Sequence, residues 1–293
     1  MVIAVTGVSG FIGRNVAQHF INQGYEVVGI SRSNPNMEDL HYIQADLTNE
    51  KTLPRLGNAL VVHCAAQTHD SSFSSTRAIN VSGTANALML APDGKFIHVS
   101  SSSIYNLTSN SFDVSEEEFR YGDYPFYNHY SKTKAEAEIL LEQTGTKRTV
   151  APIILRPHGV YGPDDTTVLP RLTDRIRRNS LMLPNGGNVE HSLTHVNNLI
   201  RAVECSRKFQ FDGVEAFNIA DLTPTKIADA VSQVIGRSIK IRSVSSSLAL
   251  RIAKRTSRIS EYEIRQIGFN RTYSITKAQN ILGYKPRDFV VDW

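Results

Sequence analysis

The chain opens with an apolar strand that runs directly into a glycine-rich turn and then into a helix. Val2–Thr6 is apolar and β-branched, Gly7 and Gly10 follow, and Gly13 lies in a segment with apolar side chains at helical intervals. A second apolar run, Tyr25–Ile30, completes a βαβ unit whose two strands must be parallel. This opening restricts the fold strongly, because parallel sheets are normally covered by helices on both faces.

The same alternation of strands and helices continues along the first half of the chain. Further strands are predicted at 60–64, 96–100 and 150–155, and helices at 76–90 and 131–142. We therefore predict the α/β class, with a Rossmann-type doubly wound parallel sheet and a smaller C-terminal α/β substrate-binding cap. The turn-rich segments Gly162–Asp165 and Leu183–Gly187 interrupt the alternation and bracket a predicted arginine-bearing helix.

Length, charge and cysteine content exclude several other classes of protein. A chain of 293 residues can form a core without disulfides, and the two cysteines, Cys64 and Cys205, cannot make a disulfide framework. No apolar stretch approaches roughly 18 residues, and Met1 leads into a strand without a basic leader, so we expect no membrane insertion or secretion and a cytoplasmic location. A net charge of +4 is too mild to indicate nucleic-acid binding.

The glycine-rich turn itself predicts a dinucleotide site. Gly7, Gly10 and Gly13 stand where the backbone must turn tightly, approach a pyrophosphate and let the helix pack close to the sheet. The helix N-terminus offers free N–H groups and a partial positive charge to the phosphates. Residues 1–162 are therefore predicted as the dinucleotide-binding domain, with returning segments near 193–222, and residues 163–192 and 223–293 as the cap.

The end of the second strand indicates which dinucleotide is preferred. An NAD site places a carboxylate there, but this chain has Ser31 and Arg32, with no acid before Glu38. A hydroxyl and a guanidinium suit a 2′-phosphate, which a carboxylate would repel. We predict NADP as the cofactor. The alternative is an Arg32 that faces solvent in a loop tolerating either cofactor, so NAD also fits.

A tyrosine and a lysine four residues apart form the core of the predicted catalytic site. Tyr130 and Lys134 fall on one face of a helix, and an ammonium nearby favours the phenolate of a tyrosine whose ordinary pKa is roughly 10. The hydroxyl residues Ser100–Ser103 follow an apolar strand, at the edge of the sheet where doubly wound folds bind ligands.

These motifs together resemble a known family. The chain is similar to the extended short-chain dehydrogenase/reductase family, in particular its NAD-dependent epimerase/dehydratase branch. The matching segments follow the family's order over most of the chain: Thr6–Gly13, Asp46–Thr48, Ala65–Ala66, Asn80–Thr84, Ser101 with Ile104–Tyr105, Tyr130 with Lys134, Leu155–Pro157, Val160–Pro163 and Leu282–Pro286.

The resemblance implies a concerted exchange of a hydride and a proton. Tyr130 would be the acid/base, and Lys134 would hold the nicotinamide ribose and depress the tyrosine pKa. Ser101, four residues before Tyr105, would hydrogen-bond the substrate oxygen, with Ser102 as the second choice. Asn80 would support the lysine through a backbone or water link. The cofactor contacts expected are Gly7, Ser9, Gly10, Phe11, Ile12, Gly13, Ser31, Arg32, Asp46, Leu47, Ala65, Ala66, Asn80, Tyr130, Lys134, Pro157 and Val160.

Departures from the family's patterns narrow the reaction. Dehydratases carry an Asp-Glu pair where this chain has Ser102 and Ser103, so dehydration is not expected. Nucleotide-sugar enzymes of the family often place an arginine, which grips the diphosphate, where this chain has His191. Arg171 or Arg175 could replace that arginine. The substrate contacts expected are thus Ser102, Arg171, Arg175 and His191.

The sequence leads to one preferred function and several alternatives. We expect an NADP(H)-linked oxidoreductase acting on a secondary alcohol or ketone of a nucleotide-activated sugar, by 4-keto sugar reduction. The family resemblance also implies a homodimer. The alternatives are an NAD-dependent nucleotide-sugar 4-epimerase, a 3β-hydroxysteroid or flavonol-type dehydrogenase, and a cofactor-sensing regulator without catalysis. A hydrolase is not expected, because no Gly-x-Ser-x-Gly motif is present. No metal site is expected, because the histidine pairs lack a helix-borne carboxylate motif.

Overall fold

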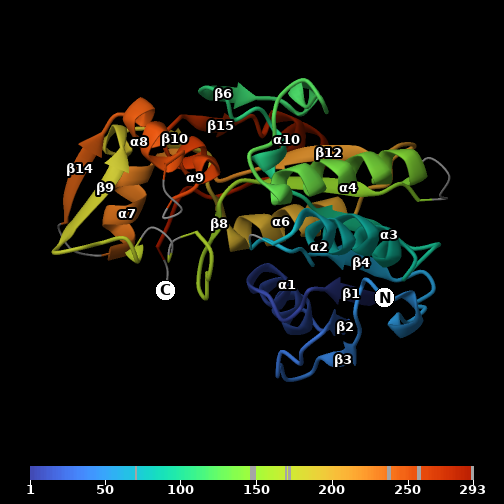
Figure 1. Cartoon of the computed structure of the whole chain (residues 1–293). Coiled ribbons are helices and arrows are strands. Elements are labelled where there is room, and N and C mark those ends of the chain that lie inside the picture. Colours follow the sequence, from blue (N-terminus) through green and yellow to red (C-terminus); the bar gives the residue numbers. More distant parts are fainter. Residues whose placement is uncertain are drawn as a thin grey trace.

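The central feature of the computed structural model is a seven-stranded parallel sheet (Figure 1). The structure describes residues 1–69, 71–145, 150–168, 170, 173–235, 239–255 and 259–291. The sheet order is β12-β7-β5-β4-β1-β2-β3, and every neighbouring pair in it is parallel. Its strands are β1 (Val2–Thr6), β2 (Glu26–Ser31), β3 (His41–Gln44), β4 (Leu60–His63), β5 (Phe96–Val99), β7 (Ile153–Pro157) and β12 (Glu215–Ile219).

Helices cover both faces of this sheet, which confirms the predicted doubly wound architecture. On one face lie α1 (Phe11–Asn22), α6 (Val196–Ser206) and α10 (Thr276–Leu282), whose buried side chains share a core with Ile3 and Val5 of β1. On the other face lie α3 (Gly83–Leu88) and α4 (His129–Gly145), in a core with Ala4. Successive residues of β1 thus point to opposite cores, as the period of a strand requires.

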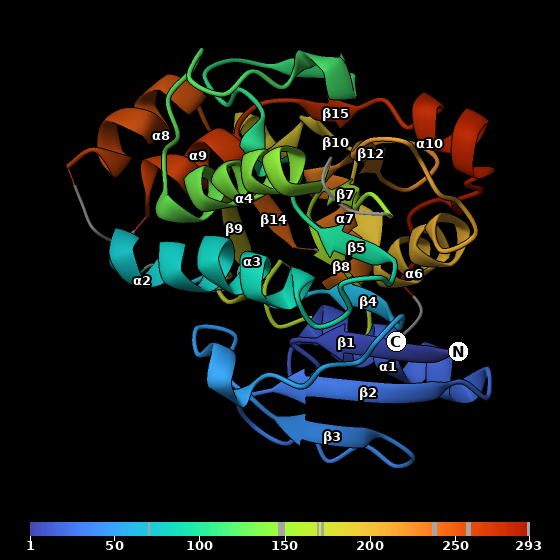
Figure 2. The ribbon, with the colours of Figure 1, turned by 90° about the vertical axis from the view of Figure 1, so that its right-hand side faces the viewer.

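The helical segment before α3 is not a regular α-helix. The sequence predicts one helix over 76–90, whereas the chain forms α2 (Phe73–Arg77), a π turn at Ala78–Ser82 and then α3. Figure 2 shows α2 and α3 running alongside α4. Single π turns inside helices are frequent at functional sites, and this one carries Asn80.

A second layer of short strands and helices forms the cap. A four-stranded sheet has the order β13-β10-β15-β6, and a separate pair joins β14 to β9. These strands are β6 (Ser111–Val114), β9 (Ser180–Pro184), β10 (Glu190–His191), β13 (Thr225–Lys226), β14 (Lys240–Val244) and β15 (Arg271–Tyr273). The helices around them are α7 (Ile227–Ile235), α8 (Ser246–Ala253) and α9 (Glu261–Ile267). Strand β6 belongs by sequence to residues 1–162, but it pairs with β15 in the sheet of the cap.

Short elements connect the two layers. Strand β8 (Val160–Tyr161) pairs with β11 (Thr194–His195), directly before α6. The 3₁₀ helices are η1 (Glu50–Thr52), η3 (Ser102–Ile104), η4 (Glu116–Glu118) and η5 (Asn185–Gly187). Within the described ranges, no helix has the length and apolar character needed to span a bilayer.

The arginine-bearing helix predicted before β9 is present only in part among the described residues: Pro170 and Thr173 are helical, and the Asp174 N–H bonds to the Pro170 carbonyl at 2.8 Å, but the helix does not continue to Arg175. Arg175 lies in a turn, Arg177 pairs with Ser180 across a tight bend, and Arg178 and Asn179 take positive φ values of 48° and 56°. A left-handed conformation at two successive residues ends a helix, so the spacing of the arginines does not put them on one helical face.

Candidate active site

The glycine-rich turn between β1 and α1 is packed too closely to accept a side chain at Gly7 or Gly13. Gly7 has φ +69°, and a Cβ on it would lie 2.7 Å from the Ala65 Cα. A Cβ on Gly13 would collide with the Gly7 carbonyl. Helix α1 starts after Gly10, which has no side chain to cap it, so its first N–H groups can bind an anion. These residues fit the pyrophosphate of a dinucleotide.

The carboxyl end of β2 leaves a guanidinium at the surface beside the turn. Ser31 is buried and its hydroxyl donates to the Ser33 carbonyl at 2.8 Å, whereas Arg32 is exposed. The Asp46 carboxylate accepts hydrogen bonds from Thr48, which lower its pKa, and Arg32 lowers it to a lesser extent. Since Arg32 forms no ion pair with any described residue, it can bind a phosphate.

Asn80 fixes the loop after β4 to the helix that carries Tyr130. Its side-chain oxygen accepts from the Gln67 backbone N–H at 2.7 Å, and its amide donates to the Gln67 carbonyl at 3.2 Å and to the Thr133 hydroxyl at 2.9 Å. Asn80 therefore contacts Thr133, the residue before Lys134, and not Lys134 itself. The loop held in this way contains Ala65 and Ala66, two of the predicted cofactor contacts.

The three predicted catalytic residues come together at the carboxyl end of β5. The Ser101 hydroxyl accepts a hydrogen bond from the Ser103 N–H at 3.1 Å and lies close enough to the phenol of Tyr130 to lower its pKa. Lys134 donates to the Val99 carbonyl at 2.7 Å, two residues before Ser101. Of the serines at 100–103, only Ser101 is partly exposed. This burial pattern supports the choice of Ser101, and the catalytic roles stay predictions.

Burial dominates the electrostatics of this cluster. It raises the pKa of Tyr130 above its ordinary value; Tyr262 of α9 raises it further, and the Ser101 hydroxyl opposes the rise. Burial lowers the pKa of Lys134 to about 8, against the opposing effects of Cys64 and Glu138. The sequence led us to expect a Tyr130 pKa lowered by Lys134. That expectation does not hold here, because Lys134 turns towards the Val99 carbonyl.

A buried ion pair next to the catalytic cluster was missed by the sequence analysis. Glu138 of α4 and Arg156 of β7 are paired at 2.7 Å, with exposed side-chain fractions of 0% and 3%. Arg156 also donates to the Tyr105 hydroxyl at 2.8 Å, and Ser100 donates to the Glu138 carboxylate. A glutamate four residues after Lys134, on the same helical face, was the available signal.

On the substrate side, Ser102 and His191 have internal partners. The Ser102 hydroxyl is fully buried and lies 2.8 Å from His158 Nδ1, and His158 Nε2 lies 3.1 Å from His191 Nδ1. Burial lowers the pKa of His158 to about 3 and that of His191 well below its ordinary value, so both rings are neutral near pH 7. A neutral His191 fits the expectation that other residues must bind any diphosphate, and its predicted contact with the substrate stays a prediction.

The predicted arginine contacts divide into one that is paired and one outside the described residues. Arg175 Nη2 lies 2.7 Å from a carboxylate oxygen of Glu263, which also caps α9 through Ser260. Arg171 belongs to the residues that the structure does not describe. Pro157 ends β7 and Val160 begins β8, so both stand at the same edge of the sheet as Ser101.

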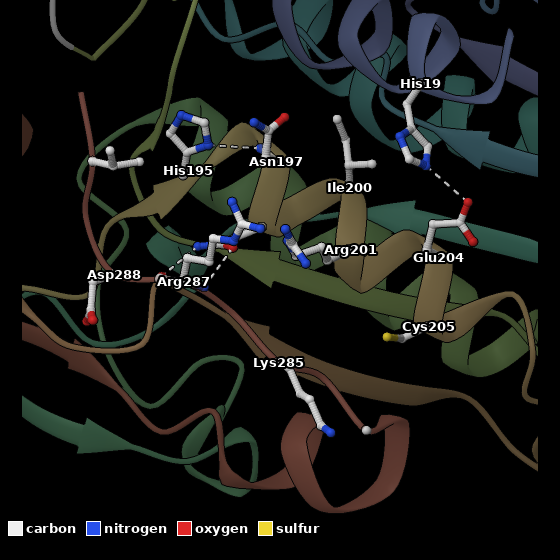
Figure 3. Close-up of a pocket in the computed structure, with 13 residues that line it drawn as sticks. His19, His195, Asn197, Ile200, Arg201, Glu204, Cys205, Lys285, Arg287 and Asp288 are labelled. Carbon is white, nitrogen blue, oxygen red and sulfur yellow. Dashed lines mark hydrogen bonds and ion pairs between the residues drawn. The ribbon is translucent and has the colours of Figure 1, made fainter. Parts of the chain in front are cut away.

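A cavity of about 400 Å³ lies away from this cluster, between α6 and residues 283–290 (Figure 3). Its lining includes the basic side chains of Arg201, Lys285 and Arg287, and Glu204, which is paired with His19 at 3.0 Å. None of the predicted catalytic, cofactor or substrate residues lines it. This cavity is therefore separate from the candidate active site.

Comparison with known proteins identifies the class of protein. The sequence profile of the NAD dependent epimerase/dehydratase family matches residues 3–220, and the chain belongs to that family. This confirms the resemblance seen in the sequence. A 2-alkyl-3-oxoalkanoate reductase of Stenotrophomonas maltophilia is 25% identical, with 98% of this chain and 95% of the relative covered. A 3beta-hydroxysteroid-dehydrogenase/decarboxylase (isoform 1) of Arabidopsis thaliana is 24% identical, with 96% and 75% covered.

Solved structures show the same fold. The UDP-glucose 4-epimerase of Thermotoga maritima, determined with UDP-glucose, superposes with a TM-score of 0.77 at 20% identity, covering 98% of this chain and 94% of the other. The family and the fold together define the class of protein, a Rossmann-type member of the NAD dependent epimerase/dehydratase family.

Proposed function

We propose that this protein is an NAD(P)-dependent oxidoreductase that acts at a secondary alcohol or ketone, with NADP(H) as its preferred cofactor. The observation that carries the proposal is that Ser101 lies close enough to the Tyr130 phenol to lower its pKa at the sheet edge, with Lys134 one helical turn from Tyr130 on α4. The cofactor preference rests on the exposed guanidinium of Arg32.

The residues of this cluster suit the reduction of a carbonyl. A bound nicotinamide would supply the hydride. Tyr130, whose pKa is raised by burial, keeps its proton near pH 7 and can donate it to the carbonyl oxygen as that oxygen gains charge. Ser101 can donate a hydrogen bond to the same oxygen when its hydroxyl turns from Tyr130 to the substrate, because its contact with the Ser103 N–H uses only an acceptor site. Lys134 would hold the ribose.

The substrate side favours a ketone without a diphosphate. Binding a diphosphate requires available cations, but His191 is buried and neutral, and Arg175 is paired with Glu263. Two relatives are named as a 3-oxoalkanoate reductase and a 3beta-hydroxysteroid dehydrogenase, and the ketones and alcohols in those names carry no nucleotide. We infer that the substrate is a largely apolar carbonyl compound without a nucleotide, such as a 3-oxo acid or a 3-ketosteroid.

Reduction of a 4-keto nucleotide sugar is the second candidate. Similar structures hold UDP-glucose or UDP-glucuronic acid, and Arg171, outside the described residues, could supply the missing cation. The 4-epimerase alternative depends on the same diphosphate contacts.

Two substrate panels, tested with NADPH and NADH, separate these possibilities. One contains 3-oxo acids and 3-ketosteroids, and the other contains UDP-glucose and a 4-keto nucleotide sugar. We expect oxidation of NADPH, followed by absorbance, with members of the first panel only. Interconversion of UDP-glucose and UDP-galactose without added cofactor would instead establish an epimerase. A protein that binds cofactor but converts neither panel would favour a regulator.

A further inference from the structure

The buried pair of Glu138 and Arg156 connects the two segments that carry the candidate catalytic residues. Glu138 lies on α4, one helical turn beyond Lys134 and two beyond Tyr130. Arg156 lies on β7 and meets both carboxylate oxygens, with Nε at 3.1 and 3.2 Å and Nη2 at 2.7 Å. Such a forked contact fixes both side chains in orientation as well as in distance.

The carboxylate end of this pair holds the residue that precedes Ser101. The Ser100 hydroxyl donates to Glu138, and the Ser100 N–H donates to the Leu155 carbonyl at 2.7 Å. The end of β5 is therefore tied to α4 through a side chain and to β7 through the backbone. Ser101 follows this fixed point directly.

The guanidinium end holds Tyr105, the residue that follows the serine turn, as we call Ser101 together with η3. Arg156 Nη1 donates to the Tyr105 hydroxyl at 2.8 Å and to the Glu116 carbonyl at 3.1 Å. The Tyr105 hydroxyl in turn donates to Asn218 at 2.7 Å. Since Ser101 caps η3 at one end and Tyr105 ends it at the other, the short helix is held on both sides.

We propose that Glu138 and Arg156 act as positioning residues, which set the Ser101 hydroxyl against Tyr130 and Lys134 for the reaction. This inference rests on the proposed function. A buried ion pair is weak support for stability, because well-packed apolar residues of similar volume often stabilise a fold equally well. An apolar pair could not form the hydrogen bonds by which Glu138 and Arg156 join α4, β7 and both ends of the serine turn.

Glu138 also acts on the charge of Lys134. Its carboxylate raises the pKa of Lys134, whereas burial lowers it to about 8. The other titratable side chains around Lys134 are neutral near pH 7: burial raises the pKa of the Cys64 thiol to about 12, lowers that of His63 to about 3, and holds that of His98 well below its ordinary value. Lys134 is protonated below pH 8, and loss of Glu138's charge would move its deprotonation to lower pH.

The test compares Glu138→Gln with Glu136→Gln. Glu136 is the matched control, because it lies on the same helix and pairs with Arg77 at 3.0 Å at the surface. For Glu138→Gln we expect kcat to fall about tenfold or more with little change in KM. The upper limb of the pH profile should move down by about one unit. The pH dependence of NADPH binding, followed by fluorescence, should move in the same direction. Glu136→Gln should change none of these.

A second variant keeps the inference testable if Glu138→Gln does not fold. Glu138→Gln combined with Arg156→Met removes both charges, and Ser100→Ala removes one hydrogen bond alone. Wild-type kcat and pH profiles in the folded variants, with only a lower unfolding temperature, would overturn the positioning role. Failure of the wild type on every carbonyl substrate would instead overturn the proposed function, and the shift in NADPH binding would still test the pair.

Discussion

The cofactor side and the substrate side of the sheet edge differ in what makes them suitable for binding. On the cofactor side, Gly7 and Gly13 let the backbone pack closely, the uncapped start of α1 provides N–H groups, and Arg32 is exposed. On the substrate side, the polar side chains of His191 and Arg175 are already bound to partners within the protein. A site made by backbone is visible in a sequence pattern, whereas a site made by side chains depends on which partners the fold supplies.

The largest expected effect tests whether the two sides meet at Tyr130. Tyr130→Phe removes the proton donor but keeps the ring, so cofactor binding and the unfolding temperature should change little. We expect turnover to fall at least about a hundredfold, the usual size of a general-acid contribution. Steady-state kinetics with the best ketone measure this loss, and near-normal turnover would remove Tyr130 from the mechanism.

The next effect concerns the cofactor side alone. Gly13→Ala places a methyl group against the Gly7 carbonyl, so the turn must shift away from the position that accepts the pyrophosphate. We expect the dissociation constant for NADPH to rise about tenfold or more, by analogy with the loss of a charge-assisted contact. Gly213→Ala is the control, because a Cβ at Gly213 meets no atom within 4 Å. Equal affinities of the two variants would contradict the role of the turn.

Arg32→Ala sharpens the comparison within the cofactor side. Loss of a guanidinium that binds a 2′-phosphate should weaken NADPH about tenfold and leave NADH unchanged. Fluorescence titration of both cofactors against wild type and variant measures this ratio. A wild type that prefers NADH would show that Arg32 only faces solvent.

The smallest effect is expected on the substrate side. Arg175→Gln breaks a half-exposed pair with Glu263, so we expect a loss of stability below about 1 kcal/mol and less than a twofold change in kcat/KM with ketones. Thermal unfolding and steady-state kinetics give the two values. A large rise in KM for a nucleotide sugar would show that Arg175 leaves Glu263 to bind the diphosphate.

The sequence was most informative where a periodic pattern or a fixed spacing determines the geometry. The βαβ opening, the glycine turn and the i,i+4 spacing of Tyr130 and Lys134 follow from local rules, and the structure forms β1, α1 and β2 and puts both residues on α4. Among the four serines at 100–103, only Ser101 is partly exposed. This agrees with its choice as the catalytic serine, which was made because it stands four residues before Tyr105 in the sequence.

What the sequence did not reveal depends on contacts between distant segments. The fork of Glu138 and Arg156, and the contact of His158 with His191, join residues that only the fold brings together. The sequence also did not predict the turn at Arg178, because arginines at this spacing are as compatible with a helix as with a bend. Strand β3 was missed because its outer residues are exposed and lack a continuous apolar run.

The cap sheet has a consequence for how the chain matures. Its strands come from residues 111–114, 190–191, 225–226 and 271–273, so β6 acquires its neighbour only after most of the polypeptide has been synthesised. Until then the unpaired edge of β6 is open to wrong partners, which is the usual route to aggregation. A chain shortened before β15 would therefore be expected to bind chaperones or to be degraded, even though all seven strands of the parallel sheet were present.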